Sequence, residues 1–216
     1  MFFDFDGLAP RDRYKLVTAS VVPRPIAWLV TEDEAGVRNA APFSFFNVFS
    51  SDPMIVGIGC SPREAGGVVG GVKDTVANIR ALGEFVLCLV DEDRLEAMNV
   101  TAADWTPDED ELREAGLTAA PSVKVRPPRI AKSPVALECV LHQLVPAGSQ
   151  VIVLGRVVAM HLRDDCVLDP ARCYVDTARL RLVGRLGSGG GYVRLNDVVE
   201  LPRVDAATVR RRRDGR

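Results

Sequence analysis

The sequence is poor in the residues on which metal and nucleophilic catalysis depend. Its 216 residues include only two histidines, His142 and His161, and neither stands near other metal ligands in the sequence. Zinc and iron centres need clusters of His, Cys and carboxylate ligands, so we expect no metal site. The sequence has no G-x-S-x-G motif and no cysteine in a catalytic signature. Hydrolysis through a protein nucleophile is therefore disfavoured.

Long apolar runs are also missing, and neither sign of charge dominates. The most apolar stretches, Val21 to Val30 and Val151 to Met160, fall well short of the ~20 apolar residues that cross a bilayer, so we expect no membrane span. Met1 to Asp6 contain no basic segment before an apolar run, which argues against a secretory signal. A net charge of −2 offers no general attraction for nucleic acid. An odd number of cysteines without C-x-x-C spacing indicates reduced thiols in a cytoplasm: Cys60, Cys88, Cys139, Cys166 and Cys173.

What the sequence does contain is the composition of a soluble globular protein, with 47% hydrophobic and 26% charged residues. We expect one domain over residues 1–186. Residues 187–216 would form a C-terminal extension that packs on this domain or on a partner subunit. The extension begins with Gly187 to Gly191, expected to be a flexible hinge, and ends with the basic run Arg210 to Arg213. We expect that run to be a solvated tail rather than a contact for an anionic partner.

Short runs rich in Val and Ile between turn residues predict a mainly β protein. The expected strands are Tyr14 to Val22, Ile26 to Thr31, Ala40 to Val48, Met54 to Cys60 and Phe85 to Val90. Two longer strands, Val135 to Val145 and Val151 to Leu162, would form a hairpin through residues 146–149. Helices are expected over Thr75 to Leu82, which begins at Asp74 and ends at a left-handed Gly83, and over Asp91 to Met98 and Asp108 to Ala115. Because strands and helices do not alternate regularly, an antiparallel barrel is favoured over a Rossmann-type sheet.

Two glycine patterns resemble nucleotide-binding motifs and fail their tests. In the run from Gly66 to Thr75, Lys73 is separated from the last glycine and is followed by an aspartate where a P-loop has Ser or Thr. The pair within Gly57 to Gly59 lacks the third glycine of a dinucleotide fingerprint. No embedded nucleotide domain is therefore expected. The shortage of acid and base candidates favours a reaction carried out by a bound cofactor.

Three segments suit an anionic or flat cofactor, each with an ordinary alternative. Lys73 to Thr75 open a helix whose backbone N–H groups, lysine and threonine hydroxyl fit a phosphate, or they are a capped surface turn. Asn39 to Pro53 combine aromatic and small residues whose main chain could bind the edge of a flat ring, or they form an aromatic core strand. Two prolines hold the chain extended around Arg24, whose guanidinium would bind a phosphate or a structural carboxylate.

Taken in this order, the segments resemble the flavin reductase-like family with an FMN-binding split barrel, which includes flavoredoxins and the reductase components of two-component flavin monooxygenases. The matching stretches are Arg24 to Thr31, Asn39 to Pro53, Lys73 to Thr75 with Asn78 and Ile79, Gly83 to Phe85, Ser133 to Cys139, Gly155 to Val158, and Val183 to Gly187 followed by Tyr192. Two departures are Met54, where relatives often have a second proline, and the unusual richness in glycine before Lys73.

The resemblance implies a six-stranded antiparallel Greek-key split β-barrel with a few flanking helices, working as a homodimer with FMN near the subunit contact. It also implies which residues bind the cofactor. The isoalloxazine ring would be lined by Asn39, Ala40, Ala41, Phe43, Ser44 and Phe45, the ribityl chain or phosphate approached by Ser50 and Ser51, and the phosphate bound by Lys73 and Thr75, with Arg24 a weaker candidate.

The activity implied by the resemblance is hydride transfer from NADH or NADPH to the flavin, followed by electron transfer to oxygen, a partner monooxygenase or another acceptor. No side chain is expected to act as a catalytic acid or base, because the cofactor carries the chemistry. Two alternatives stay open. One is a flavoredoxin-type FMN electron carrier that is reduced by a protein partner, and the other is a non-catalytic flavin-binding barrel.

Overall fold

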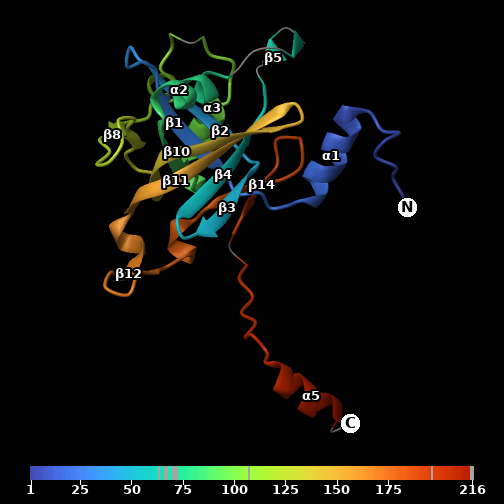
Figure 1. The fold of residues 1–216 in the computed structure, drawn as a ribbon. Helices are drawn as coiled ribbons and strands as arrows, with labels where there is room; N and C mark the ends of the chain where they lie inside the picture. The colour runs from blue at the N-terminus through green and yellow to red at the C-terminus, as the bar shows by residue number, and fades with distance from the viewer. Residues whose placement is uncertain (63, 66–67, 70–72, 107, 196, 215–216) are drawn as a thin grey trace.

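The centre of the fold is a seven-stranded antiparallel sheet with the strand order β2-β1-β7-β10-β11-β4-β3 (Figure 1). The structure is a computed structural model that describes residues 1–62, 64–65, 68–69, 73–106, 108–195 and 197–214, and of residues 64, 65, 68, 69, 209 and 212–214 it describes the backbone alone. The expected glycine-rich run before Lys73 therefore lies mostly outside the described residues. The strands of the sheet are β1 Ala27–Glu32, β2 Arg38–Phe43, β3 Phe46–Ser51, β4 Met54–Cys60, β7 Glu84–Leu89, β10 Val135–Ala147 and β11 Gln150–Leu162.

Short strand pairs and helices surround this sheet. The pairs are β5 Glu64–Ala65 with β6 Val68–Val69, β8 Ala119–Ala120 with β9 Arg129–Ile130, β12 Val167–Asp169 with β13 Tyr174–Val175, and β14 Val183–Arg185 with β15 Tyr192–Arg194. The α-helices are α1 Pro10–Ser20, α2 Asp74–Leu82, α3 Leu95–Val100, α4 Glu111–Glu114 and α5 Ala206–Asp214, and the 3-10 turns are η1 Glu92–Arg94, η2 Asp164–Cys166 and η3 Ala178–Leu180. Within the described ranges, no helix is both long enough and apolar enough to span a membrane.

The expected mainly β, antiparallel architecture is confirmed, with seven strands in the sheet rather than six. The single strand expected over Ala40 to Val48 divides at Ser44 and Phe45 into β2 and β3, which lie at opposite edges of the sheet. The N–H of Gly59 donates to the carbonyl of Phe45 over 2.7 Å and ties this bend to β4. Because β2 and β3 do not pair with each other, the sheet stays open and its two edges come from one short stretch of chain.

Strand β1 is buried on both of its faces. Trp28 and Val30 face one hydrophobic cluster, and Ala27 and Leu29 face a second cluster on the opposite side of the sheet. Alternate side chains of a strand point to opposite faces, so both layers of the core pack against this strand. The indole N–H of Trp28 also donates to the Thr101 hydroxyl over 2.9 Å. Strand β2, which pairs with β1 along its whole length, is therefore held on a rigid support.

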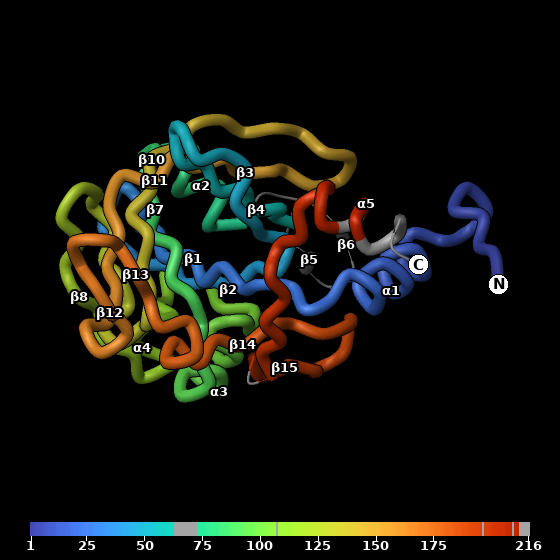
Figure 2. The backbone as a smooth tube through the Cα atoms, turned by 90° about the horizontal axis from the view of Figure 1, so that it is seen from below, coloured from blue at the N-terminus to red at the C-terminus, as the bar shows by residue number. Residues whose placement is uncertain are grey.

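The strand expected over Tyr14 to Val22 is wrong, because residues 10–20 form helix α1. Pro10 occupies a position in the first turn, where its fixed φ favours a helix, and Asp12 pairs with Lys15 over 3.3 Å one turn later. The Val and Tyr content of the segment suggested a strand, yet the apolar side chains of Tyr14 and Val17 are largely exposed. Helix α1 lies to one side of the sheet in both views (Figures 1 and 2).

The long hairpin and the first core helix agree with expectation. Strands β10 and β11 are joined by a two-residue turn at Gly148 and Ser149, with Gly148 at φ +60°. Helix α2 ends at Gly83, which is left-handed at φ +71°. Its start differs by one residue, because Lys73 rather than Asp74 holds the N-cap position.

The glycine-rich segment after β14 is the loop of a hairpin rather than a hinge. Arg185 of β14 pairs with Tyr192 of β15, and Leu186 donates its N–H to the Gly191 carbonyl over 2.9 Å. The β14–β15 hairpin lies beside α3, as Figure 2 shows. Beyond β15 the chain leaves the sheet and ends in α5, which stands apart from it (Figure 1). The basic run Arg210 to Arg213 lies in α5, and the side chains of its last two residues are outside the described parts.

Candidate cofactor site

Strand β2 presents its backbone at an open edge of the sheet. It pairs with β1 on one side, and the described residues supply no strand on its other side. The N–H of Ala40 points to the open side, since it donates to Oε2 of Glu111 over 3.0 Å. Backbone groups two residues apart point the same way in an antiparallel strand, so the carbonyls of Ala40 and Pro42 share this side. Pro42 has no N–H, and this part of the edge therefore offers mainly acceptors to a ligand.

A chain of hydrogen bonds joins β2 to two helices. The hydroxyl of Thr75, in the first turn of α2, donates to Oδ1 of Asn39 over 2.7 Å. The Nδ2 of Asn39 donates in turn to Oε1 of Glu111 in α4 over 2.6 Å. Burial raises the pKa of Glu111, whose residue is 6% exposed, and the hydrogen bonds from Ala40 and Asn39 oppose that shift. The network fixes the spacing between the edge of β2 and the start of α2.

Lys73 and Thr75 line a cavity against the open edge of β2, which we call the Lys73 cavity. The cavity is small, about 110 Å³, and its β2 wall is formed by Asn39, Ala41 and Pro42. The Nζ of Lys73 lies 5.5 Å from the centre of the Phe43 ring. The two stretches that the sequence assigns to one ligand therefore meet at a single cavity.

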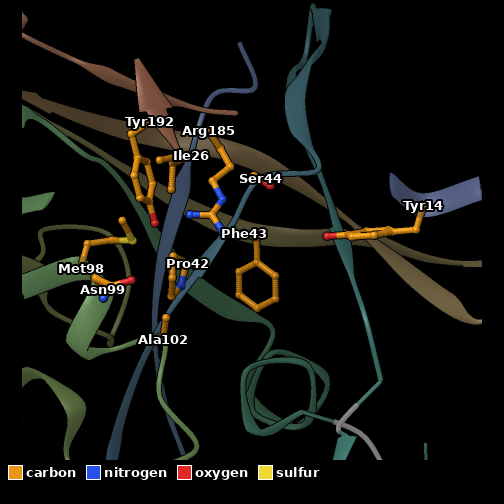
Figure 3. A pocket seen from close by; sticks show the side chains of 10 residues that line it. All are labelled: Tyr14, Ile26, Pro42, Phe43, Ser44, Met98, Asn99, Ala102, Arg185 and Tyr192. Carbon is orange, nitrogen blue, oxygen red and sulfur yellow. The ribbon is translucent and has the colours of Figure 1, made fainter. Parts of the chain in front are cut away.

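A second cavity, which we call the Arg185 cavity, continues along β2 toward the bend. It measures about 220 Å³ and is lined by Pro42 and Phe43 of β2 and by Ser44 of the bend, with Arg185 and Tyr192 opposite (Figure 3). Both cavities include Pro42 and Ala102 in their walls, so they adjoin each other along β2, and we call the two together the groove. At the outer end, the ring of Tyr14 from α1 lies 6.1 Å from that of Phe45. The groove thus has a flat apolar wall along β2 and polar groups at each end.

The structure brings most of the expected site residues to this groove. Asn39, Ala41, Lys73 and Thr75 line the Lys73 cavity, Phe43 and Ser44 line the Arg185 cavity, and the buried Ala40 supplies backbone groups between them. Three others lie elsewhere. Phe45 faces Gly59 beyond the bend, and Ser50 and Ser51 pair with Ile55 and Met54 at the far end of β3, outside both cavities.

Arg24 is buried and its guanidinium is already engaged by the protein. Its Nη1 donates to the carbonyls of Thr18 and Val21 over 2.5 and 3.0 Å, and its Nη2 donates to the carbonyl of Gly187 over 2.8 Å. Its Nε donates to the Ser44 hydroxyl over 3.3 Å. The side chain therefore joins the end of α1 to the β14–β15 loop, and its Nε, Nη1 and Nη2 all donate to groups of the protein itself.

Sequence reasoning did not assign Glu111, Arg185 or Tyr192 to the site. Glu111 stands 72 positions from Asn39 in a four-residue helix, and no local pattern links the two. Arg185 and Tyr192 entered only through the general resemblance of the C-terminal segment. A prediction that β14 pairs with β15 would have placed Arg185 beside Tyr192. The glycine-rich loop between the two strands suggested a hinge instead.

Cysteine and metal chemistry find little support elsewhere in the fold. Four of the five cysteines are buried, and burial raises the pKa of Cys60 to about 12 and that of Cys88 to about 11. Thiols with such pKa values stay protonated and are poor nucleophiles. In the part of the chain that the structure describes, no group of three or more His, Cys, Asp or Glu side chains is arranged to hold a metal ion.

Comparison with known proteins assigns this chain to a family. The chain belongs to the flavin reductase like domain family, whose model matches residues 19–179. An uncharacterized protein of Deinococcus radiodurans is 42% identical over 95% of this chain and 90% of its own length. Two solved structures are similar throughout. The 2-nitrobenzoate 2-nitroreductase NbaA of Pseudomonas fluorescens is 32% identical with a TM-score of 0.85, covering 95% of this chain and 97% of that one. Nitrilotriacetate monooxygenase component B of Bacillus cereus is 30% identical with a TM-score of 0.86, covering 93% and 98%.

Proposed function

We propose that this protein binds FMN in the groove along β2 and reduces it with a hydride from NADH or NADPH. The observation that carries the proposal is the meeting of the open β2 edge and the start of α2 at one groove, where Ala41 and Pro42 face Lys73 and Thr75. Membership of the flavin reductase like family supports the same ligand class. The acceptor-rich edge of β2 suits a ring that carries an N–H donor, and Phe43 with Pro42 provides a flat apolar wall.

Within this proposal the two ends of the groove have different tasks. Lys73 and the N-terminal end of α2 bind the phosphate, because a helix N-terminus and a cation both attract a dianion. The carbonyls of Ala40 and Pro42 on the open edge of β2 and the side chains of Phe43 and Ser44 bind the ring. Thr75 positions Asn39 through its hydroxyl and lines the phosphate end. Phe45, Ser50 and Ser51 do not carry the proposal, because they line neither cavity.

The bound flavin would supply the redox chemistry, accepting a hydride and passing electrons to a second molecule. The protein's own part is to orient the ring and to leave one face accessible, since the described chain has no dinucleotide-binding fold for the donor. Similarity to nitrilotriacetate monooxygenase component B supports a partner monooxygenase as the destination of the electrons. Similarity to 2-nitrobenzoate 2-nitroreductase supports a small aromatic acceptor as the second candidate.

We also propose that the protein is a cytoplasmic homodimer. Strand β3 forms the second edge of the sheet and carries exposed apolar side chains, with Val48 54% and Phe49 67% exposed. Met160 of β11 lines the same cavity as Val48, and we call the exposed edge formed by β3 together with Met160 the β3 face. An exposed apolar edge strand tends to pair or aggregate unless another surface covers it, and a second copy is the simplest cover. The free cysteines fit a reducing compartment.

The test is to titrate the purified protein with FMN and then to mix the complex anaerobically with NADH or NADPH in a stopped-flow instrument. The expected result is stoichiometric binding followed by loss of the flavin's visible absorbance. Binding without reduction by either nucleotide would select the flavoredoxin-type electron carrier instead. No uptake of FMN would refute the proposal and leave a non-catalytic barrel.

A further inference from the structure

Arg185 carries its guanidinium over the ring-binding half of the groove. The residue belongs to β14, and its backbone exchanges two hydrogen bonds with Arg24, of 3.1 and 2.8 Å. The centre of its guanidinium lies 4.6 Å from the centre of the Tyr192 ring on the paired strand. Figure 3 shows the guanidinium extending from β14 toward Pro42 and Phe43 of β2. Hydrogen bonds to Arg24 thus hold the backbone of Arg185, the Tyr192 ring contacts its guanidinium, and the guanidinium points into the cavity.

The charge of Arg185 is not neutralised by a neighbouring carboxylate. Among the residues described, no Asp or Glu lies within salt-bridge distance of its guanidinium, whereas Arg194 on the paired strand binds Glu92 over 3.1 Å. Of the residues that the structure describes, Arg185 is also the one charged residue that lines its cavity. The Lys73 cavity has the opposite balance, with one lysine and the carboxyl groups of Asp74, Asp104 and Glu111. The groove is therefore positive at the Arg185 end.

We propose that Arg185 stabilises the reduced, anionic form of the flavin and so raises its reduction potential. The inference rests on the proposed function, which places the ring at this end of the groove. A hydride brings two electrons and one proton, so a neutral ring gains one negative charge while the nicotinamide donor leaves as its oxidised cation. A fixed cation in a partly dehydrated cavity attracts that new charge more strongly than water does. It has less effect on the neutral oxidised ring.

Arg185 lies in the C-terminal β14–β15 hairpin, beyond the part of the chain that the family model matches. The family model ends at residue 179, so the match does not include β14 or β15. Tyr192 holds the guanidinium by its ring face, and cation–π contacts of this kind stabilise an arginine that has no carboxylate partner. The hairpin therefore adds an electrostatic element to a groove that the matched region otherwise builds.

The test compares the affinities of the protein for oxidised FMN and for FMN reduced anaerobically with dithionite. Arg185→Gln is expected to raise the ratio of the reduced to the oxidised Kd about tenfold, which equals a fall of about 30 mV in a two-electron potential. Arg185→Lys keeps the charge and restores most of the ratio. Tyr192→Leu, which frees the guanidinium, gives an intermediate ratio. The control Arg194→Gln leaves the ratio unchanged, because that side chain faces Glu92 outside both cavities.

Three results would overturn the inference in distinguishable ways. An unchanged ratio in both Arg185→Gln and Tyr192→Leu would show that Arg185 does not act on the redox state. An equal loss of affinity for both forms of FMN, with riboflavin binding retained, would place Arg185 at the phosphate. Failure of the unsubstituted protein to bind either form would refute the proposed function itself. Arg185→Gln keeps the backbone bonds to Arg24 and so leaves the hairpin folded.

Discussion

The side chains of Asn39 and Glu111 share a hydrogen bond of 2.6 Å that joins the edge strand β2 to helix α4. The other carboxylate oxygen of Glu111 accepts the N–H of Ala40, the next residue of the strand. A single buried carboxyl group thus satisfies two donors at an edge that has no strand partner in the described chain. The edge is held in place by a side chain while its neighbouring carbonyls stay open to a ligand.

Replacing Glu111 with alanine should destabilise the protein. The change leaves the Ala40 N–H and the Asn39 amide without their acceptor, and one unsatisfied buried donor costs about 1 to 3 kcal/mol. We expect the free energy of unfolding to fall by about 3 kcal/mol in urea titrations. The control is Glu114→Ala on the same helix, whose carboxylate pairs with the exposed Arg113 and contributes little. Equal losses in the two variants would contradict this role of Glu111.

Stability at acid pH should depend on Glu138. This buried carboxylate accepts hydrogen bonds from the Val123 and Lys124 N–H groups, over 2.8 and 2.5 Å, and lies 2.5 Å from Nε2 of His161. Burial alone would raise the pKa of Glu138, but these hydrogen bonds outweigh it and lower the pKa. A folded pKa below the unfolded value gives stability that is present above the unfolded pKa of about 4.3 and is lost as pH falls through the folded value.

Glu138→Gln should therefore flatten the loss of stability below about pH 4.3, measured as urea midpoints across an acid series. Glu111 provides a comparison, because its pKa shift has the opposite sign to that of Glu138. Its raised pKa means that stability falls as pH rises from the unfolded value toward the raised folded value. Glu111→Gln should remove that decline and leave the acid limb in place. If Glu138→Gln retains the full acid slope of the unsubstituted protein, the assignment to Glu138 fails.

Gly155→Ala should destabilise the central sheet. A Cβ at this position would lie 2.3 Å from Cζ of Phe85, whose ring is completely buried and has little room to move. Overpacking of this kind costs about 1 to 3 kcal/mol, to be measured as a shift in the urea midpoint. Gly189→Ala is the matched control, because nothing lies within 4 Å of its added methyl group. A midpoint that moves equally in both variants would rule out the packing explanation.

Lys73→Ala should weaken the binding of FMN by roughly 1 to 3 kcal/mol, because a charge-assisted contact to the phosphate is lost. The affinity for riboflavin, which has no phosphate, should change little. Fluorescence titration measures both. Arg80→Ala, in the last turn of the same helix, serves as the control. A dissociation constant for FMN that stays unchanged would remove Lys73 from the site.

Sedimentation should give a species of twice 23.4 kDa for the unsubstituted protein. Val48→Glu places a charge on the β3 face and should shift the equilibrium to the monomer, because a charge buried without a partner is strongly unfavourable. Leu168→Glu introduces the same charge at another exposed apolar position, on β12, and should leave the dimer intact. A single 23.4 kDa species in the unsubstituted protein would refute the dimer.

Local sequence patterns were sufficient to predict the elements whose residues have the propensity for the structure that they adopt. Strand β4 has the predicted bounds Met54–Cys60, and the β10–β11 hairpin closes on the small residues that the sequence shows between two β-branched runs. Helix α1 was missed because its Val and Tyr content suggested a strand, although Pro10 marks a helix start. The break between β2 and β3 was missed because Phe45 and Phe46 continue the aromatic pattern across the bend.

The residues of the candidate groove could be predicted only where one short segment of the sequence carries them. Lys73 and Thr75 are recognised by their position at a helix start, and Ala41 by the small residues around it. Glu111 and Arg185 reach the groove through tertiary packing from distant segments, so no spacing in the sequence marks them. Arg24 shows the converse, because a position between two prolines fits a ligand contact and a structural tie equally well, and the structure uses it as a tie.

The bend at Ser44 and Phe45 directly connects the two edge strands of the sheet, so a change of length there affects both edges. An extra residue there would slip β2 against β1 or β3 against β4, and a slip of one position turns every side chain of a strand to its opposite face. The change would disturb the groove along β2 and the β3 face together. Length variation among members of this family should therefore collect at the exposed tip of the β10–β11 hairpin, around Gly148, and spare the bend.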